Sequence, residues 1–153
     1  TSGLGTAETG GAWRVTGSTS GYAVNGGVGR ITMAAAGAGP DVSLPAVSSA
    51  STDLSLALTA EKPMTGGGLY ASVVGRRVAG VGDYRAKLQL RSTGAVALSL
   101  VRTAGSTETA IAPAAVLPGV TYVPGQRLLV RLQVTGASPT TVQARVWAAG
   151  TPE

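Results

Sequence analysis

The chain has 153 residues and a mass of 15.0 kDa, which is the size of one domain with a single core. It contains neither cysteine nor histidine, which excludes a disulfide framework, a thiolate nucleophile and the commonest general base. Ten arginines and two lysines against seven acids give a net charge of +5, which attracts acidic partners, although a genome biased toward Ala, Gly, Arg and Val codons explains the excess of arginine equally well.

The N-terminal third is rich in glycine and predicts only loops and short strands. A strand is expected from Ala12 to Thr16. A hairpin is expected next, formed by Tyr22 to Asn25 and Val28 to Met33 around a Gly-Gly turn. Ala34 to Pro40 should be a loop, because two glycines and a closing proline oppose a helix. Asp41 to Val47 then returns to a strand.

The middle of the chain contains the clearest strand patterns. Asp53 to Ala60 alternates leucine with small or polar residues, which predicts a half-buried strand. LYASVVGRRV, residues 69–78, is expected to be a central strand with a bulge at Gly75. Asp83 to Thr103 contains two alternating runs around Ser-Thr-Gly, which predicts a β-hairpin with a three-residue loop.

The C-terminal third begins with a weaker predicted strand, Thr107 to Ala112, and a proline-punctuated crossover, Pro113 to Pro124. Two strong strands follow, Arg127 to Thr135 and the segment TTVQARVW, with a turn at Gly136 to Pro139 between them. About ten short strands separated by turn signals predict an all-β, antiparallel β-sandwich or jelly roll. No run of 18 apolar residues occurs, so no membrane insertion is expected.

Four segments of strand and turn pattern cover most of the chain: GLGTAETGGAW from Gly3, VVGRRV from Val73, YRAKLQLRSTGAVALSLVR from Tyr84 and LLVRLQVTGASPTTVQARVWAAGTPE from Leu128. In these segments the sequence resembles the concanavalin A-like lectin and glucanase family, in the laminin-G-like form of secreted actinobacterial proteins and of tail proteins of their phages. The resemblance implies a concanavalin A-like β-sandwich. The family holds sugar binders, glycan hydrolases and structural modules, so the fold does not settle the function.

The resemblance also implies that strands are missing at both ends. Similar chains place an aromatic-bearing strand before the segment that matches Gly3 to Trp13, and the residues from Trp147 onward resemble the lead-in to closing strands. Residues 1–153 are therefore expected to form a single sandwich domain that lacks its first and last strands and is a fragment of a longer polypeptide. We expect another chain, or another segment of the same polypeptide, to complete a sheet by main-chain pairing.

Cations on the polar side of three predicted strands form the strongest candidate surface. If these strands share one sheet, the like charges repel one another, and an acidic ligand would relieve the repulsion. The alternative is a solvated face on which arginine stems cover apolar surface. Trp147 shares this side and would either stack on a sugar or cap the end of the sandwich. The candidate ligand-binding residues are Arg85, Lys87, Arg91, Arg127, Arg131, Arg145 and Trp147.

The acids form no pattern typical of catalysis. Glycan hydrolysis needs two carboxyl groups on either side of the scissile bond, whereas the acids of this chain never stand two or four residues apart on one strand. We therefore predict no catalytic, metal or cofactor residues, and calcium held by Asp41, Asp53 or Asp83 stays an alternative. The seven acids are Glu8, Asp41, Asp53, Glu61, Asp83, Glu108 and Glu153.

The sequence thus predicts a non-catalytic recognition or adhesion module, extracellular or virion-associated, that binds a glycan or an anionic cell-surface polymer. A second hypothesis is a structural β-sandwich subunit that assembles with copies of itself or decorates a virion or cell-surface appendage. A glycan hydrolase is a remote third. No nucleic-acid partner is expected.

Overall fold

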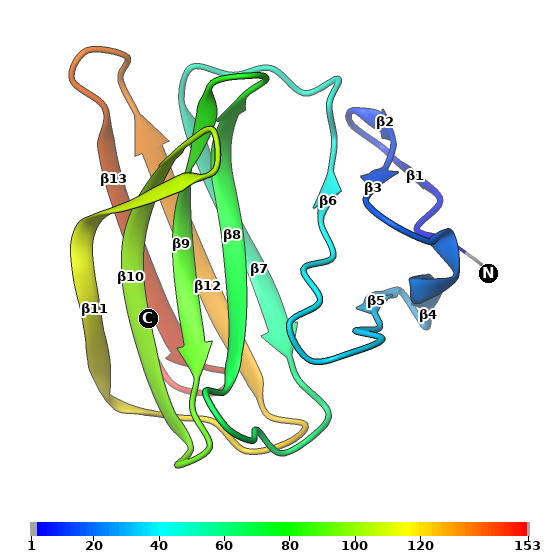
Figure 1. Ribbon diagram of the computed structural model, residues 1–153, viewed down its shortest axis with the longest axis vertical. Helices are drawn as coiled ribbons and strands as arrows, with labels where there is room; N and C mark the ends of the chain where they lie inside the picture. The colour runs from blue at the N-terminus through cyan, green and yellow to red at the C-terminus, as the bar shows by residue number, and fades with distance from the viewer. Residues whose placement is uncertain (1–2, 153) are drawn as a thin grey trace. The chain divides into compact units, whose positions relative to one another are not determined.

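The computed structural model describes residues 3–152 and consists of antiparallel strands and one 3-10 turn, Thr19–Gly21 (Figure 1). The all-β antiparallel class expected from the sequence is confirmed. Within the described residues no helix is long and apolar enough to cross a membrane. The chain divides into two compact units, Thr1–Ser48 and Ser49–Glu153.

The first unit is built from short antiparallel pairs. The hairpin expected from Tyr22 is confirmed, since β4 and β5 pair from Tyr22↔Ile31 to Asn25↔Val28. The expected strand Ala12 to Thr16 is divided between β2 and β3, and the expected strand from Asp41 is reduced to two residues. The strands are β1 (Thr6–Ala7), β2 (Gly11–Ala12), β3 (Arg14–Val15), β4 (Tyr22–Asn25), β5 (Val28–Ile31) and β6 (Val42–Ser43), paired as β1-β2, β3-β6 and β4-β5.

Tyr22 anchors this unit. Its side chain is buried, and its hydroxyl donates to the carbonyl oxygen of Thr16 at 2.7 Å and to that of Asp41 at 3.3 Å. A buried tyrosine needs such partners for its hydroxyl. The bonds tie the β4–β5 hairpin to the two segments that lead out of β3 and into β6.

The second unit contains two antiparallel sheets. One has four strands in the order β11-β10-β9-β8 and the other three in the order β13-β12-β7, and we call them the four-stranded and the three-stranded sheet. The strands are β7 (Thr52–Thr59), β8 (Leu69–Val78), β9 (Gly82–Leu90), β10 (Ala95–Ala104), β11 (Thr107–Thr121), β12 (Arg127–Thr135) and β13 (Thr141–Ala148).

The two sheets share one apolar core. In β12, and in β9 from Ala86 onward, every second residue is buried, as the two-residue period of a strand with one covered face requires. The opposite residues of these strands face away from the core. The buried cluster combines both sheets and consists of Val73, Ala86, Leu88, Leu90, Val96, Tyr122, Leu128, Val130, Leu132, Val134 and Val146.

The predicted hairpin over residues 83–103 is confirmed. Strands β9 and β10 pair without interruption from Val96↔Leu90 to Arg102↔Tyr84. Gly94 closes the turn with a φ of 83°, which favours glycine, and its amide donates to the carbonyl of Arg91 at 3.0 Å. The amide of Tyr122 donates in turn to the carbonyl of Gly94 at 2.8 Å, so the turn is fastened to the end of β11.

The bulge expected at Gly75 is also confirmed. The register of β8 against β9 shifts between Val74 and Arg76, which leaves Gly75 without a partner in the ladder. A Cβ atom at this position would lie 2.5 Å from Cγ2 of Val134 and 3.1 Å from Cδ2 of Leu132. Glycine therefore allows the bulge to approach the core side of β12 closely.

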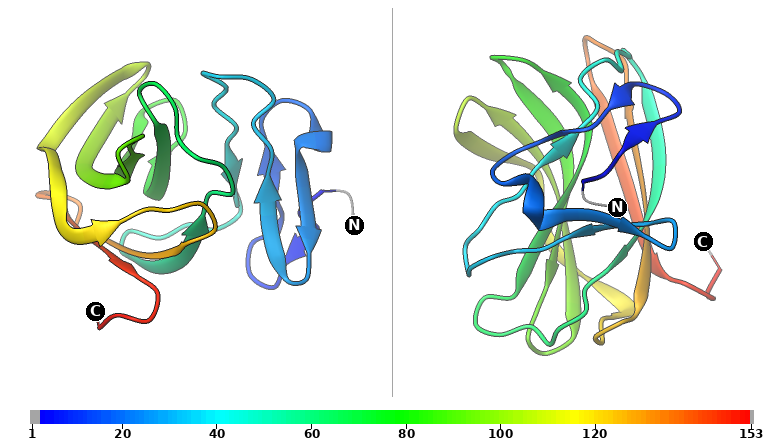
Figure 2. Two further views of the ribbon diagram at one scale, coloured as in Figure 1. Left: turned by 90° about the horizontal axis from the view of Figure 1, so that it is seen from below. Right: turned by 90° about the vertical axis from the view of Figure 1, so that its right-hand side faces the viewer.

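The expected crossover from Pro113 to Pro124 is wrong over most of its length. β11 runs continuously to Thr121 and includes both Pro113 and Pro118. It is an edge strand, and prolines are tolerated at an edge because a missing amide there costs no ladder bond. Three register shifts between β10 and β11 accompany the bent course that β11 follows in Figure 2.

Candidate functional site

The outer face of the four-stranded sheet carries a hollow of about 250 Å³. It lies over β8, β9, β10 and β11, on the side of the sheet away from the shared core. Small apolar side chains, one aromatic ring and a few polar groups line it, a combination that small-ligand sites share. The lining residues include Tyr70, Lys87, Gln89, Ser99, Val101 and Glu108.

Tyr70 provides the exposed ring of this hollow. Its relative exposure is 56%. Its strand, β8, is an edge of the four-stranded sheet and not the central strand that the sequence predicted. Nζ of Lys87 lies 5.1 Å from the centre of the ring, and Nε2 of Gln89 donates to the Tyr70 hydroxyl at 2.8 Å. Both contacts follow from the β8–β9 register, which places Tyr70 opposite Gln89. The ring is thus held in place while one side stays open.

Small residues of β10 form the floor. Ala97 and Val101 point away from the shared core, yet they are only 1% and 2% exposed. Longer side chains from both neighbouring strands cover them. Nζ of Lys87 on β9 pairs with Oε1 of Glu108 on β11 at 2.6 Å, across the intervening strand β10. This ion pair closes one side of the hollow.

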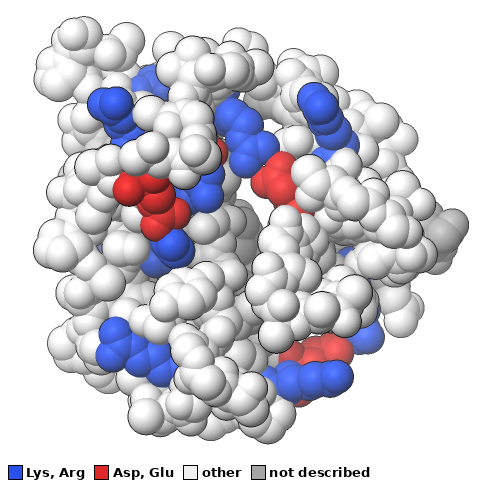
Figure 3. All heavy atoms as spheres, in the orientation of Figure 1, with Lys and Arg blue, Asp and Glu red and all other residues white. Residues whose placement is uncertain are grey.

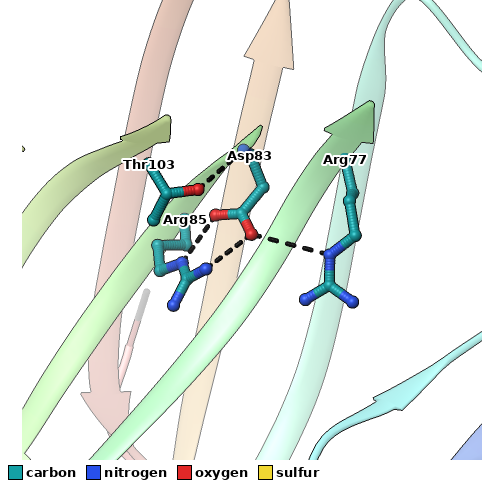
Figure 4. A network of polar contacts seen from close by, with 4 residues as sticks. All are labelled: Arg77, Asp83, Arg85 and Thr103. Atoms are coloured by element: carbon teal, nitrogen blue, oxygen red, sulfur yellow. Dashed lines mark hydrogen bonds and ion pairs between the residues drawn. The ribbon is translucent and has the colours of Figure 1, made fainter. Parts of the chain in front are cut away.

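A second polar cluster is centred on Asp83, near the start of β9 (Figure 4). Nε and Nη2 of Arg85 contact the two carboxylate oxygens of Asp83 at 2.6 Å and 2.5 Å, and Nε of Arg77 lies 3.5 Å from Oδ2. The amide of Asp83 donates to Oγ1 of Thr103 at 2.8 Å. Asp83 is only 6% exposed, and a buried carboxylate needs such cationic partners. This cluster fixes the start of β9.

The structure divides the candidate cations of the sequence between two sheets. Arg85 and Lys87 belong to β9, and Arg91 follows directly after it, in the four-stranded sheet. Arg127 and Arg131 belong to β12 and Arg145 to β13, in the three-stranded sheet. The condition for one joint basic surface, that these strands share a sheet, is therefore not met. Alternation shows which side of a strand is polar but not which sheet the strand joins.

Several of these cations are also neutralised locally. Arg85 pairs with Asp83, Lys87 with Glu108 and Arg131 with Asp53. In Figure 3 acidic side chains accordingly stand beside basic ones on the face that is shown. The surface over β9 is a row of matched charges more than a continuous positive patch.

On the outer face of the three-stranded sheet, Asp53 accepts from two residues of β12. Nη2 of Arg131 and Nε2 of Gln133 each lie 2.8 Å from its Oδ2. These hydrogen bonds, together with the charge of Arg131, lower the pKa of Asp53 from 3.8 to about 2. The carboxylate is therefore ionised throughout the physiological range.

The remaining candidate residues lie on the three-stranded sheet without joining the hollow. Trp147 is half-buried and stands opposite Leu129 in the ladder, so its ring has an apolar neighbour on the outer face. Arg127 and Arg145 are exposed, and neither forms an ion pair with another described residue. This face lacks an exposed ring enclosed by polar groups.

Of the residues that line the hollow, only Lys87 was among the sequence candidates; the most important ones that were missed are Tyr70 and Glu108. Tyr70 was hidden because its strand carries small residues on both faces, and Glu108 because it looked like a turn acid. Lys87 contacts both of them, and it does so because β8, which carries Tyr70, pairs with β9, and β11, which carries Glu108, pairs with β10. The signal available in the sequence was the presence of one aromatic residue in an otherwise small-residue strand.

Comparisons with protein-family models, with curated proteins and with solved structures identified no match for this chain. Within residues 3–152 no group of three or more potential metal-ligating side chains comes together. The function is therefore inferred from the geometry of the hollow.

Proposed function

We propose that this chain is a non-catalytic recognition module that binds a glycan in the hollow beside Tyr70. The observation that carries the proposal is the exposed tyrosine ring, fixed by Lys87 and Gln89 at the edge of a hollow on a sheet face. In this proposal the two sheets are those of a concanavalin A-like β-sandwich.

The chemistry of the hollow suits a sugar. A pyranose presents an apolar face that packs against an aromatic ring and hydroxyl groups that exchange hydrogen bonds around its rim. Tyr70 supplies the ring. Ser99 supplies a hydroxyl and Glu108 a carboxylate, and the amide oxygen of Gln89 can accept a further hydrogen bond beside that from Arg91. Tyrosine combined with adaptable polar side chains is typical of recognition surfaces that bind without covalent chemistry.

The arrangement of carboxylates supports binding without hydrolysis. Glu108 is the one acid among the residues that line the hollow, and it is paired with Lys87. Glycosidases of both stereochemical classes need a second carboxyl group on the other side of the bond. Asp83, the next acid along the sheet face, is committed to Arg85. We place the module outside the cell or on a virion, where glycan-recognition domains of the resembled kind act.

A glycan array tests the proposal with the wild-type chain, Tyr70→Ala and Tyr70→Phe. Loss of an aromatic anchor should cost about 2 kcal/mol of binding free energy, roughly thirtyfold in Kd. Tyr70→Phe keeps the ring and should retain most of the affinity. Thermal unfolding of each variant serves as the control, because the Tyr70 side chain is largely exposed. If no glycan binds at low salt, or if Tyr70→Ala binds as the wild type does, the proposal is refuted.

A structural role is the second candidate, and the edges of the three-stranded sheet favour it. β7 and β13 each pair with β12 over eight consecutive residues without a bulge, whereas β8 and β11, the edges of the other sheet, carry register shifts. Sheet edges with a regular register and no bulge can accept a further strand from another chain. Light scattering after size exclusion separates this candidate from the first, since a monomer at high concentration would exclude self-assembly.

A further inference from the structure

One cation in the row formed by Arg85 and Lys87 of β9 and by Arg91, which follows that strand, differs from the other two. Arg91 donates from Nε to Oε1 of Gln89 at 3.1 Å, and no carboxylate pairs with it. Its two terminal nitrogens, Nη1 and Nη2, form no bond within the described residues. Arg85 and Lys87 in the same row are each matched by an acid. Arg91 is therefore a positive charge that its own fold orients but does not neutralise.

The contact with Gln89 connects Arg91 to the hollow. The same side-chain amide accepts from Arg91 through Oε1 and donates through Nε2 to the Tyr70 hydroxyl at 2.8 Å and to the Gly67 carbonyl at 2.9 Å. Hydrogen bonds in such a chain polarise one another, so a ligand bound to Arg91 would affect the bond between Gln89 and Tyr70. The guanidinium consequently lies one amide away from the exposed ring.

The backbone below Arg91 is firmly held. Its amide donates to the carbonyl of Ala95 at 3.0 Å, and its carbonyl accepts from Gly94 at 3.0 Å. The turn is fastened through Gly94 to Tyr122, whose hydroxyl donates to the carbonyls of Ala60 and Lys62 at 2.9 Å and 2.7 Å. A side chain on such a support loses little further freedom when it binds, which raises the affinity for a ligand.

We propose that Arg91 recognises an anionic substituent, a carboxylate or a phosphate, on the glycan that occupies the Tyr70 hollow. This inference rests on the proposed function of that hollow and adds the class of its ligand: an acidic glycan. The two terminal nitrogens of a guanidinium match the two oxygens of such a group and form charge-assisted hydrogen bonds with it. Arg85 and Lys87 are less suited to bind an anion, because each already pairs with a carboxylate of the chain.

Calorimetric titration of the whole chain tests the inference. The probes are a linear trimer of galacturonic acid, the same trimer with its carboxyl groups reduced to alcohols, and a glycerol-phosphate oligomer of similar length. Wild-type protein should bind the acidic trimer about tenfold more tightly than the reduced trimer at low ionic strength, as expected for one charge-assisted contact. The preference should decrease as salt is added.

Three variants assign the preference to Arg91. Arg91→Gln should abolish it and leave the affinity for the reduced trimer unchanged, whereas Arg91→Lys should keep only part of it because the fork is lost. Arg102→Gln is the matched control. It also removes one positive charge from the four-stranded sheet, and Arg102 is exposed but alternates along β10 with Val101, so it belongs to the face opposite the hollow. Equal unfolding midpoints of the variants exclude a general loss of structure.

The outcomes separate this inference from the proposed function. If both trimers bind equally well to the wild type, or if Arg91→Gln retains the preference, the role of Arg91 is overturned while the hollow remains a glycan site. If neither trimer nor the phosphate oligomer binds while a neutral glycan of the array does, the role of Arg91 is likewise overturned, and only if no glycan of the array binds does the glycan site itself fail. Binding of the phosphate oligomer alone, lost in Arg91→Gln, would support the anion contact and identify phosphate as the group recognised.

Discussion

Replacement of Gly75 by alanine tests whether the bulge in β8 packs against β12 as described. The added Cβ would lie 2.5 Å from Cγ2 of Val134 and 3.1 Å from Cδ2 of Leu132, two side chains with 0% exposure. Overpacking of a core costs about 1–3 kcal/mol. Alanine recovers about 0.5–1 kcal/mol through the lower entropy of its unfolded chain. We therefore expect a net loss of about 1–2 kcal/mol.

Urea unfolding measures this loss. Each unit contains one tryptophan, Trp13 in the first and Trp147 in the second, so a Trp13→Phe background makes fluorescence report the second unit alone. With the denaturant dependence expected for a small protein, the midpoint should fall by roughly 0.5–1 M. Gly67→Ala is the matched control, because a Cβ there meets no atom within 4 Å. If Gly75→Ala unfolds at the same urea concentration as Gly67→Ala, or later, the close approach of the bulge to β12 is wrong.

Two further stability predictions concern side chains that hold the second unit together. Arg131 and Gln133 lower the pKa of Asp53 to about 2, below its ordinary 3.8. Asp53 therefore contributes stability that is present above about pH 4 and lost as the pH falls toward 2. The difference in unfolding free energy between wild type and Asp53→Asn, measured in urea, should shrink over this pH range, and a constant difference would contradict the ion pair. Tyr122→Phe removes the hydroxyl that bonds the Ala60 and Lys62 carbonyls and should cost about 1–3 kcal/mol, whereas an unchanged urea midpoint would show that these bonds do not stabilise the fold.

The sequence predicted local features well where the pattern was strict. The bounds of β8 coincide with the predicted residues 69–78, and the alternation around Leu88 and Leu90 correctly indicated the buried face of β9. The turn at Gly94 and the bulge at Gly75 were predicted because glycine there has a specific backbone role. These features depend on neighbours along the chain.

Features that depend on strand order were not predictable in the same way. Alternation placed Lys87 and Arg131 on polar faces but could not show that the two faces belong to different sheets. Pro113 and Pro118 indicated a loop, since only the position of β11 at an edge allows prolines in a strand. The sequence could not single out Tyr70, because its role in the hollow depends on its pairing with Gln89 on the neighbouring strand β9.

The most direct test of the account is to map the glycan on the protein by NMR. Amide resonances of the wild-type chain would be followed during titration with the tightest-binding glycan of the array. We predict that the largest shifts occur at Tyr70, Lys87, Gln89 and Ser99, around the hollow of the four-stranded sheet. Shifts concentrated instead at Asp53, Arg131 and Gln143, on the three-stranded sheet, would contradict the proposed site.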